Sequence, residues 1–478
     1  MAASDSYQPG VGFSSRADGG AAFLAAALAL AVVAIPALDR VGAPAGLVRA
    51  LGPIITLVAT AAAGIAAVNA DLPSFLAAGR SVRAFHGALA LTALALGVLL
   101  VIDRIPNPVD RPRVGVAAAG LAAGALLVGP LLRRWGASWR SDLLASRYPF
   151  WPIRLIAGLC VMVAGLLTAI AGLQSAVDVV NALVLGNRIQ AEAIVAATLF
   201  LCVAPGGAAG LVASSSTAGG ALIIMTTTVI ALEGGLDLPP FGFGAGQSFA
   251  TLTAVVLAAG GFFALDRPAL AARDWRTASR AAVGAILLCL ALAALLFAIR
   301  PQPSAIVSEN ARDSLVGGAK LAAFLALGAA GGLGVGRAFG IAGAPRRPFA
   351  PLASVRLARM RGGMLAALAA AAFIDTRGLI EPSAALVAAM AVSLASTVPL
   401  LALALLPRSG SFAAGATLAA SAVVVGLYGQ AWLHPADAAT LLPAALAAGC
   451  AGLAAGALVA LAAPRRRQAD RSSARASS

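Results

Sequence analysis

Side chains that commonly carry catalysis or bind metals are few in this chain, and their spacing suits neither task. The 478 residues include two histidines, His86 and His434, which are far apart in sequence and cannot form a metal site by themselves. No apolar stretch holds a pair of carboxylates, and no GxSxG, HExxH or GxxxxGK[ST] motif stands in a supporting context. We therefore expect a protein that is not an enzyme and that has no resident metal or other cofactor.

The cysteines indicate packing rather than chemistry. Each lies inside an apolar stretch, without CxxC spacing and without a neighbouring histidine: Cys160, Cys202, Cys289 and Cys450. A free cysteine in such surroundings behaves as a small apolar residue. We expect no disulfides and no metal ligands among them.

Long apolar stretches make up most of the chain, and charges are confined almost entirely to the joints between them. Hydrophobic residues account for 60% of the sequence and charged residues for 11%, with a mean hydropathy of +0.92. A soluble chain could not bury so much apolar surface. Because backbone polar groups in lipid must be satisfied internally, runs of roughly 20 apolar residues predict membrane-spanning helices. We expect an all-α polytopic membrane protein with about 14 spans, at residues 21–38, 51–70, 84–102, 114–132, 153–176, 189–204, 211–232, 248–265, 281–299, 318–338, 362–376, 383–406, 412–433 and 440–463.

The arginines indicate how these spans are oriented. If the N-terminus is cytoplasmic, most arginine-rich joints fall on the cytoplasmic side, as the positive-inside rule requires. We expect a multi-pass protein of the plasma (inner) membrane with both termini in the cytoplasm. The net charge of +15 then reflects topology and contact with anionic lipid headgroups of the bilayer. Nucleic-acid binding is not supported, because there is no separate basic domain and aromatic residues form only 5% of the chain.

The chain divides into four parts by composition. We expect a cytoplasmic tail at 1–20, peripheral helices and a connecting loop at 21–83, a core with C-terminal helices at 84–463, and a disordered basic tail at 464–478. The first span could instead be a signal peptide. A signal peptide begins with a positively charged region, for which Arg16 alone is weak, and the residues around Pro36 are a poor cleavage site. Both observations favour retention of the span as a helix.

Four stretches, taken in order, resemble motifs of the sodium:solute symporter family. They are residues 71–82 (DLPSFLAAGRSV), residues 131–148 with LLRRWGA and DLLASRY, residues 205–211 (PGGAAGL), and residues 395–411 with ASTVPL and LPRSGS. The second resembles the family's acetate and monocarboxylate permeases most. The residues that match the motifs are Gly79, Arg80, Gly206, Gly207, Pro399, Arg408 and Gly410. The chain is similar to a divergent member of this family.

The resemblance implies a LeuT-type fold with two inverted repeats of five helices, beginning near Ala84 and near Ser248. In such folds the first and sixth core helices are broken and hold a small solute near the bilayer midplane. The run from Gly87 to Gly97 would be the unwound segment, and Thr92 is its only hydroxyl. The substrate-binding candidates are Gly87, Thr92 and Gln174. Gln174 is equally explained as a polar contact between helices.

The resemblance is weakest at the ion site. The family's sodium ion takes backbone carbonyls from the first core helix and a hydroxyl pair from the eighth, but residues 327–337 contain no hydroxyl. We expect a degenerate sodium site and leave coupling to Na⁺ or H⁺ open. The candidates for this region are Ala90, Ala93, Gly331, Gly334 and Arg337. The guanidinium of Arg337 either replaces the ion as a tethered cation or extends to the cytoplasmic interface.

Three functional classes remain open. The first is a secondary-active transporter of a small organic solute, with a monocarboxylate as the first guess. The second is a non-transporting membrane sensor or partner subunit derived from a symporter, with a small membrane subunit as a candidate partner. The third is another polytopic fold, such as a major facilitator, although the characteristic GxxxDRxGRR loop is missing.

Overall fold

The structure is a computed structural model, and it is helical throughout the described part of the chain. It describes residues 27–30, 32–68, 72–103, 111–134, 144, 147–148, 150–233, 249–262, 266–298, 308–342, 353–404, 410–429 and 438–462. Its helices are α2 (Ala45–Ala66), α3 (Leu72–Ala77), α4 (Ala84–Ile102), α5 (Arg111–Arg134), α7 (Trp151–Val180), α8 (Arg188–Val203), α9 (Ala208–Glu233), α10 (Phe249–Gly260), α11 (Asp266–Ala271), α12 (Trp275–Ala298), α13 (Glu309–Ala342), α14 (Ala353–Thr376), α15 (Pro382–Val392), α16 (Val398–Ala404), α17 (Ser411–Leu427) and α19 (Ala438–Ala462). Three short turns, η1 (Ala78–Arg80), η3 (Asn181–Leu185) and η5 (Ser393–Thr397), join some of them.

Ten of the described helical segments are long and apolar enough to cross a membrane. They comprise α2, α4, α5, α9, α12, α13, α14 and α19, together with α7 extended by η3 and the continuous run from α15 to α16. The all-α polytopic fold class is thereby confirmed, whereas the number of 14 spans stays a prediction. Helices α8, α10 and α17 are shorter, and the first expected span is helical in its described part.

The helices of the two expected repeats contact one another in exchanged pairs. The first repeat corresponds to α4, α5, α7, α8 and α9, and the second to α10, α12, α13, α14 and α15 with α16. In this order α4 is equivalent to α10 and α5 to α12, and the contact of α4 with α12 has its counterpart in the contact of α10 with α5. In the same way, the contact of α9 with α13 has its counterpart in the contact of α15 with α7. Equivalent helices also meet, α5 with α12, α7 with α13, and α8 with α14. An inverted repeat demands this pattern, because exchanging the repeats must reproduce the same contacts.

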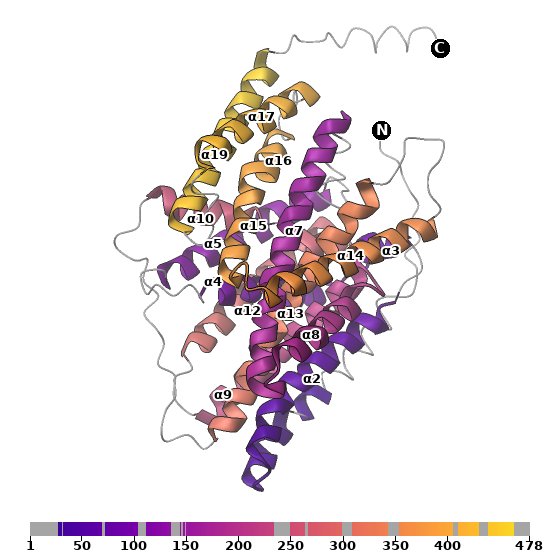
Figure 1. Cartoon of the computed structure of the whole chain (residues 1–478), viewed down its shortest axis with the longest axis vertical. Coiled ribbons are helices and arrows are strands. Elements are labelled where there is room, and N and C mark those ends of the chain that lie inside the picture. Colours follow the sequence, from indigo (N-terminus) through magenta and orange to yellow (C-terminus); the bar gives the residue numbers. More distant parts are fainter. Residues whose placement is uncertain are drawn as a thin grey trace.

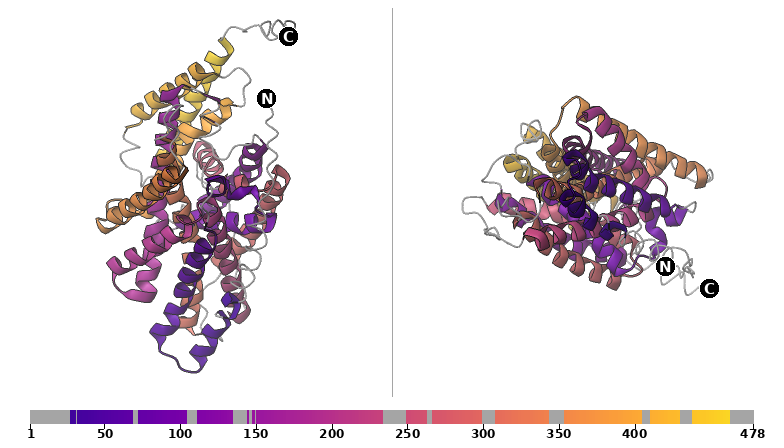
Figure 2. Two further views of the ribbon diagram at one scale, coloured as in Figure 1. Left: turned by 90° about the vertical axis from the view of Figure 1, so that its right-hand side faces the viewer. Right: turned by 90° about the horizontal axis from the view of Figure 1, so that it is seen from below.

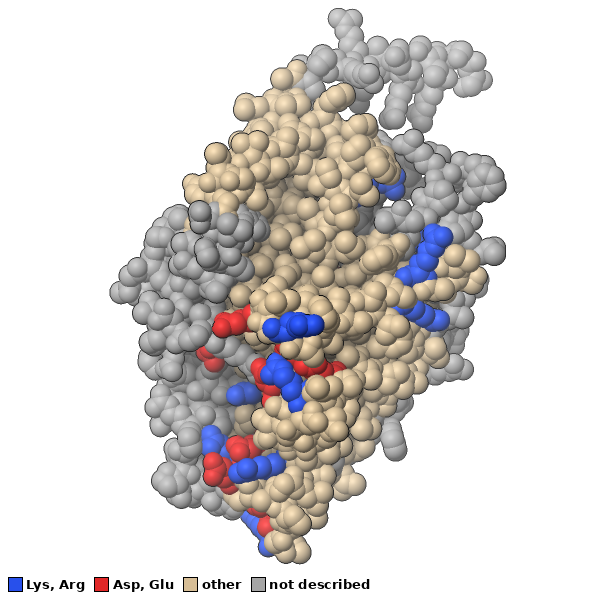
Figure 3. Space-filling model, viewed as in Figure 1, with Lys and Arg blue, Asp and Glu red and all other residues tan. Residues whose placement is uncertain are grey.

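Helices outside the repeats lie at opposite ends of the molecule (Figures 1 and 2). Helix α2 packs along α13, α9 and α8 at one end, and its Gly52 N–H donates to Ser314 Oγ at 2.9 Å. Helices α17 and α19 pack on each other at the other end. The described part of the face seen in Figure 3 is largely uncharged, with its charged side chains gathered in a few clusters, as expected for a surface in contact with lipid.

Helix α4 corrects one expectation from the resemblance. The run from Gly87 to Gly97 was expected to be unwound, but α4 is a continuous α-helix over Ala84–Ile102. Every residue from Gly87 to Ile102 is buried. The run has no proline and only Thr92 as a polar side chain, so backbone groups freed in this apolar core would have few partners. The helical hydrogen bonds therefore stay intact.

Candidate functional site

The helices that carry the ion-site candidates, α4 and α13, pack on each other at close range. A Cβ atom on Gly97 would lie 2.6 Å from Ala323 O and 3.1 Å from Leu327 Cβ, so the backbones almost touch there. Ala93 of α4 lies in the main hydrophobic core, whereas Ala90 packs with Ala209 and Val212 of α9. The other two candidates, Gly331 and Gly334, lie further along α13. All four residues are buried.

The α13 side of this region faces a second helix at very short range. A Cβ atom on Gly331 would lie 2.7 Å from Gly165 O of α7 and even closer to Ala169 N. One turn away, a Cβ on Gly172 would lie 2.9 Å from Phe324 O. Small residues permit this approach, which gives dense packing where lipid supplies no hydrophobic drive between helices. Gly331, a candidate of the ion-site region, therefore presents bare backbone to α7.

The two substrate candidates of α4 both contact α12. Thr92 is fully buried, and its hydroxyl donates to Ala88 O at 2.8 Å and to Ala285 O at 3.4 Å. A Cβ atom on Gly87 would lie 3.1 Å from the Ala281 side chain. In this conformation the Thr92 hydroxyl satisfies backbone carbonyls and does not face an open site.

Gln174, the third substrate candidate, lies on α7 near the C-terminal end of that helix. It is 3% exposed, and its Nε2 donates to Ile380 O at 2.9 Å in the loop that precedes α15. This bond is the polar contact between elements that the sequence offered as an alternative. Its role toward a substrate stays a prediction.

Arg337 is buried, at 1% exposed. Its Nη1 donates at 3.2 Å to Leu76 O in α3. The side chain thereby ties the end of α13 to α3, which precedes the first repeat. Both roles expected for Arg337 stay predictions. A residue at the end of an apolar run can point either way, and only packing decides.

The loop directly after α3, which contains the turn η1, has a strained backbone. Ala78, Gly79 and Arg80 all have positive φ, at 51°, 59° and 54°. Non-glycine residues rarely adopt this region, and a local cost on the order of 1–3 kcal/mol each must be offset by the surroundings. The loop is held further by Val82, whose N–H donates to Ala271 O at 3.2 Å. The family-like AGR motif thus forms a fixed left-handed turn.

A second motif packs on the same loop. Gly207 has a φ of +60°, and a Cβ there would lie 2.7 Å from the Phe75 ring. Arg361 of α14 lies over that ring at 5.7 Å and donates to Ala204 O and Pro205 O at 2.9 and 3.3 Å. Gly206 faces Ala67 O just as closely. The structure thus brings together two motifs that are more than 120 positions apart in sequence.

The remaining motif residues have varied positions. Arg133 of the second motif donates to Ala272 O at 2.8 Å, next to the strained loop. Pro399 follows the π-helical turn η5, whose three hydroxyls donate to carbonyls of their own helix at 2.6–3.1 Å. Gly410 is exposed before α17. Arg408 and both expected tails lie outside the described residues.

One ionic group was missed by sequence reasoning. Arg188 bridges three carboxylates, with Asp375 at 2.5 Å, Asp178 at 3.3 Å and Glu192 at 3.5 Å. The side chains of Glu192 and Asp375 are only 5% and 1% exposed. The group joins α7, α8 and α14 at one end of the α7–α13 pair. The available signal was the i, i+4 spacing of Arg188 and Glu192 at the start of an apolar span.

The described residues contain no group of three or more histidine, cysteine or carboxylate side chains able to hold a metal ion. The candidate ion-site residues thus lie on the apolar, closely packed helices α4 and α13, where glycines expose backbone to neighbouring helices. Arg337 and the strained loop lie toward one end of α13, and Arg188 with its carboxylates lies at the other end of the α7–α13 pair.

Comparison with known proteins identifies the fold but no family. No family model matches the chain, and no curated protein matches it. Among solved structures, 25 chains match. One is a Na⁺-coupled sialic acid symporter in a substrate-bound outward-open state, with a TM-score of 0.66 and 12% identity over 87% of this chain and 98% of the symporter. The chain thus has the fold of a polytopic Na⁺-coupled symporter.

Proposed function

We propose that this protein is a secondary-active transporter of a small organic solute, and that it does not bind Na⁺ at the family's usual site. The fold supports the first part, because transporters of this architecture move solutes by rocking one helix bundle against another. The observation that carries the second part is Gly331, a candidate residue of the ion-site region, whose backbone packs directly on α7. A hard cation needs several oxygen ligands, and residues 327–337 supply no side-chain oxygen.

Coupling to protons replaces coupling to Na⁺ in this proposal. Arg188 pairs with three carboxylates, and those of Glu192 and Asp375 are buried, so burial favours uptake of a proton by one of these two groups. A monocarboxylate is our first choice of solute, and it rests on the second motif alone. We place the protein in the plasma (inner) membrane with both termini in the cytoplasm, in line with the arginine-rich joints.

The test is uptake by proteoliposomes under separate ion gradients. Purified protein is reconstituted, and labelled acetate, pyruvate and proline are offered with either a Na⁺ gradient or a proton gradient, with empty liposomes as the control. We expect uptake driven by protons, unchanged when choline replaces Na⁺. Sodium-stimulated uptake that survives in Arg337→Ala would overturn the proposal. A lack of uptake under both gradients would favour the alternative of a non-transporting sensor or partner subunit.

A further inference from the structure

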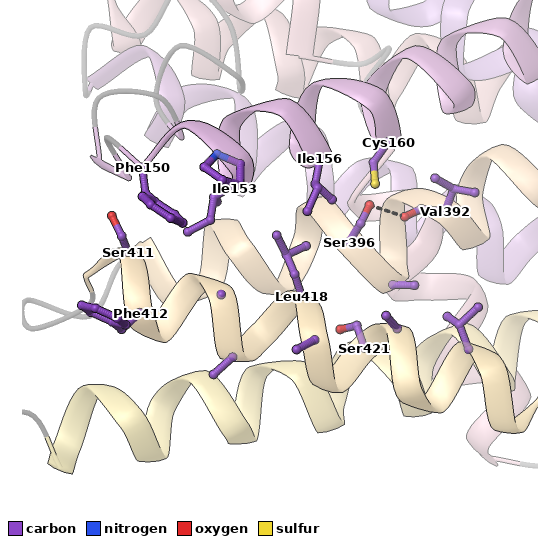
Figure 4. Close-up of a pocket in the computed structure, with 17 residues that line it drawn as sticks. Phe150, Ile153, Ile156, Cys160, Val392, Ser396, Ser411, Phe412, Leu418 and Ser421 are labelled. Atoms are coloured by element: carbon purple, nitrogen blue, oxygen red, sulfur yellow. Dashed lines mark hydrogen bonds between the residues drawn. The ribbon is translucent and has the colours of Figure 1, made fainter.

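A groove of about 850 Å³ lies away from the helix crossing, between the first half of α7, η5 and α17 (Figure 4). This volume falls within the range of roughly 300–1,000 Å³ found for ligand pockets. Ile153, Ile156 and Cys160 line it from α7, and Leu418 lines it from α17. The walls are almost wholly apolar, so the occupant must be apolar along most of its length.

Three serines line the groove; Ser411 lies at one end, and the hydroxyls of the other two are already engaged. Ser396 Oγ donates to Val392 O at 2.6 Å, which Figure 4 marks, and Ser421 Oγ donates to Ala448 O at 3.0 Å. A polar solute or a water cluster needs several hydrogen-bond partners, and these hydroxyls have no proton left to donate. A hydrocarbon chain needs none. The groove therefore favours an acyl chain over a polar molecule.

One end of the groove has the character of a membrane interface. Phe150 and Phe412 line that end and are 58% and 91% exposed, and Figure 4 shows them there. Trp151, the next residue after Phe150, is 59% exposed. Exposed aromatic side chains are typical of the headgroup level of a bilayer. Arg154 is exposed on the same turn of α7 as Ile153, and a guanidinium at this level attracts anionic headgroups.

We propose that the groove binds an anionic glycerophospholipid, with one acyl chain between α7, η5 and α17 and its phosphate on Arg154. The chain fills apolar space that would otherwise stay empty, and the aromatic residues flank the glycerol region. The bound lipid connects α17, which lies outside the two repeats, to α7 of the first repeat and η5 of the second. It is a structural ligand distinct from any transported solute.

The experiment uses two glycines whose added side chains would meet open space. A Cβ atom on Gly415, which lines the groove, meets nothing within 4 Å, and neither does one on Gly158, which lies on α7 outside the lining. Gly415→Phe fills the groove, Gly158→Phe is the matched control, and Arg154→Gln removes the headgroup contact. Each purified protein is incubated with phosphatidylglycerol or phosphatidylcholine and examined by native mass spectrometry.

We expect wild type and Gly158→Phe to retain one phosphatidylglycerol and to bind phosphatidylcholine at least tenfold more weakly. Gly415→Phe should lose at least tenfold in retention of phosphatidylglycerol, and Arg154→Gln should bind both lipids alike. If Gly415→Phe does not fold, Ala419→Phe on the same wall takes its place, with folding checked by thermal unfolding. Unchanged lipid retention in a folded groove-filling variant overturns the proposal. So does equal binding of both lipids by wild type, or a bound polypeptide in place of lipid.

Discussion

Replacing Gly331 by alanine should force α7 and α13 apart at the expected ion site. The new Cβ would lie 2.7 Å from Gly165 O, whereas ordinary contacts of a Cβ begin at 3.4 Å, so the helices must separate by at least 0.7 Å. Overpacking of this kind costs about 1–3 kcal/mol. The gain in helix propensity from glycine to alanine offsets up to about 1 kcal/mol of that cost. We expect Gly331→Ala to lower the free energy of unfolding by about 1–2 kcal/mol.

The neighbouring Gly332 provides a matched control. A Cβ there would meet only Leu368 of α14, at 3.7 Å, which is an ordinary contact. Gly332→Ala should therefore leave stability unchanged or raise it by up to about 1 kcal/mol. Both variants and wild type are purified in the same detergent and compared by denaturant unfolding followed by intrinsic fluorescence. Equal stability of the two variants would refute the close α7–α13 packing and the reasoning against a sodium site.

Three further predictions use the same measurement. Arg337→Leu should cost about 1.5–3 kcal/mol of unfolding free energy, because it removes a hydrogen bond from a buried charged donor; wild-type stability would contradict its placement. Arg188→Gln should cost about 1–3 kcal/mol by depriving buried Asp375 of its ion partner, and the double variant with Asp375→Asn should recover part of the loss. Asp274 accepts a 2.6 Å bond from Thr277 N–H at the start of α12, which lowers the pKa of its carboxyl below the ordinary value of 3.8. Its stabilising effect is present at neutral pH and is lost as the pH falls below 3.8, so Asp274→Ala should weaken the acid dependence of stability, and an unchanged pH profile would contradict this.

The sequence by itself was sufficient for the fold class and for several helix boundaries. Span 84–102 coincides with α4, and span 383–406 nearly coincides with the run from α15 to α16. The reason is that lipid leaves the backbone no partner other than itself, so an apolar run of sufficient length must be helical. The positions at which helices begin and end in polar sequence were less predictable. Helix α13 begins at Glu309, well before the expected 318, because a helix continues through polar residues once its hydrogen bonds are formed.

The composition of the candidate site was also readable from sequence. The absence of hydroxyls from residues 327–337 is a property of the chain alone, and it led to the prediction of a degenerate sodium site. The expectation of an unwound first core helix was wrong because it came from the resemblance. Between Gly87 and Gly97, Thr92 is the only polar side chain, which is too little to support an unwound segment in an apolar core.

Only the tertiary structure decided what each site residue contacts. Arg337 donates to Leu76 O, and Gly331 packs on α7, because helix packing fixes directions that sequence spacing leaves open. The same holds for Arg188, whose partner Asp375 is 187 positions away. Local sequence determines which residues lie in lipid and which are helical. Contacts between helices depend on how the whole chain packs, and no local pattern encodes them.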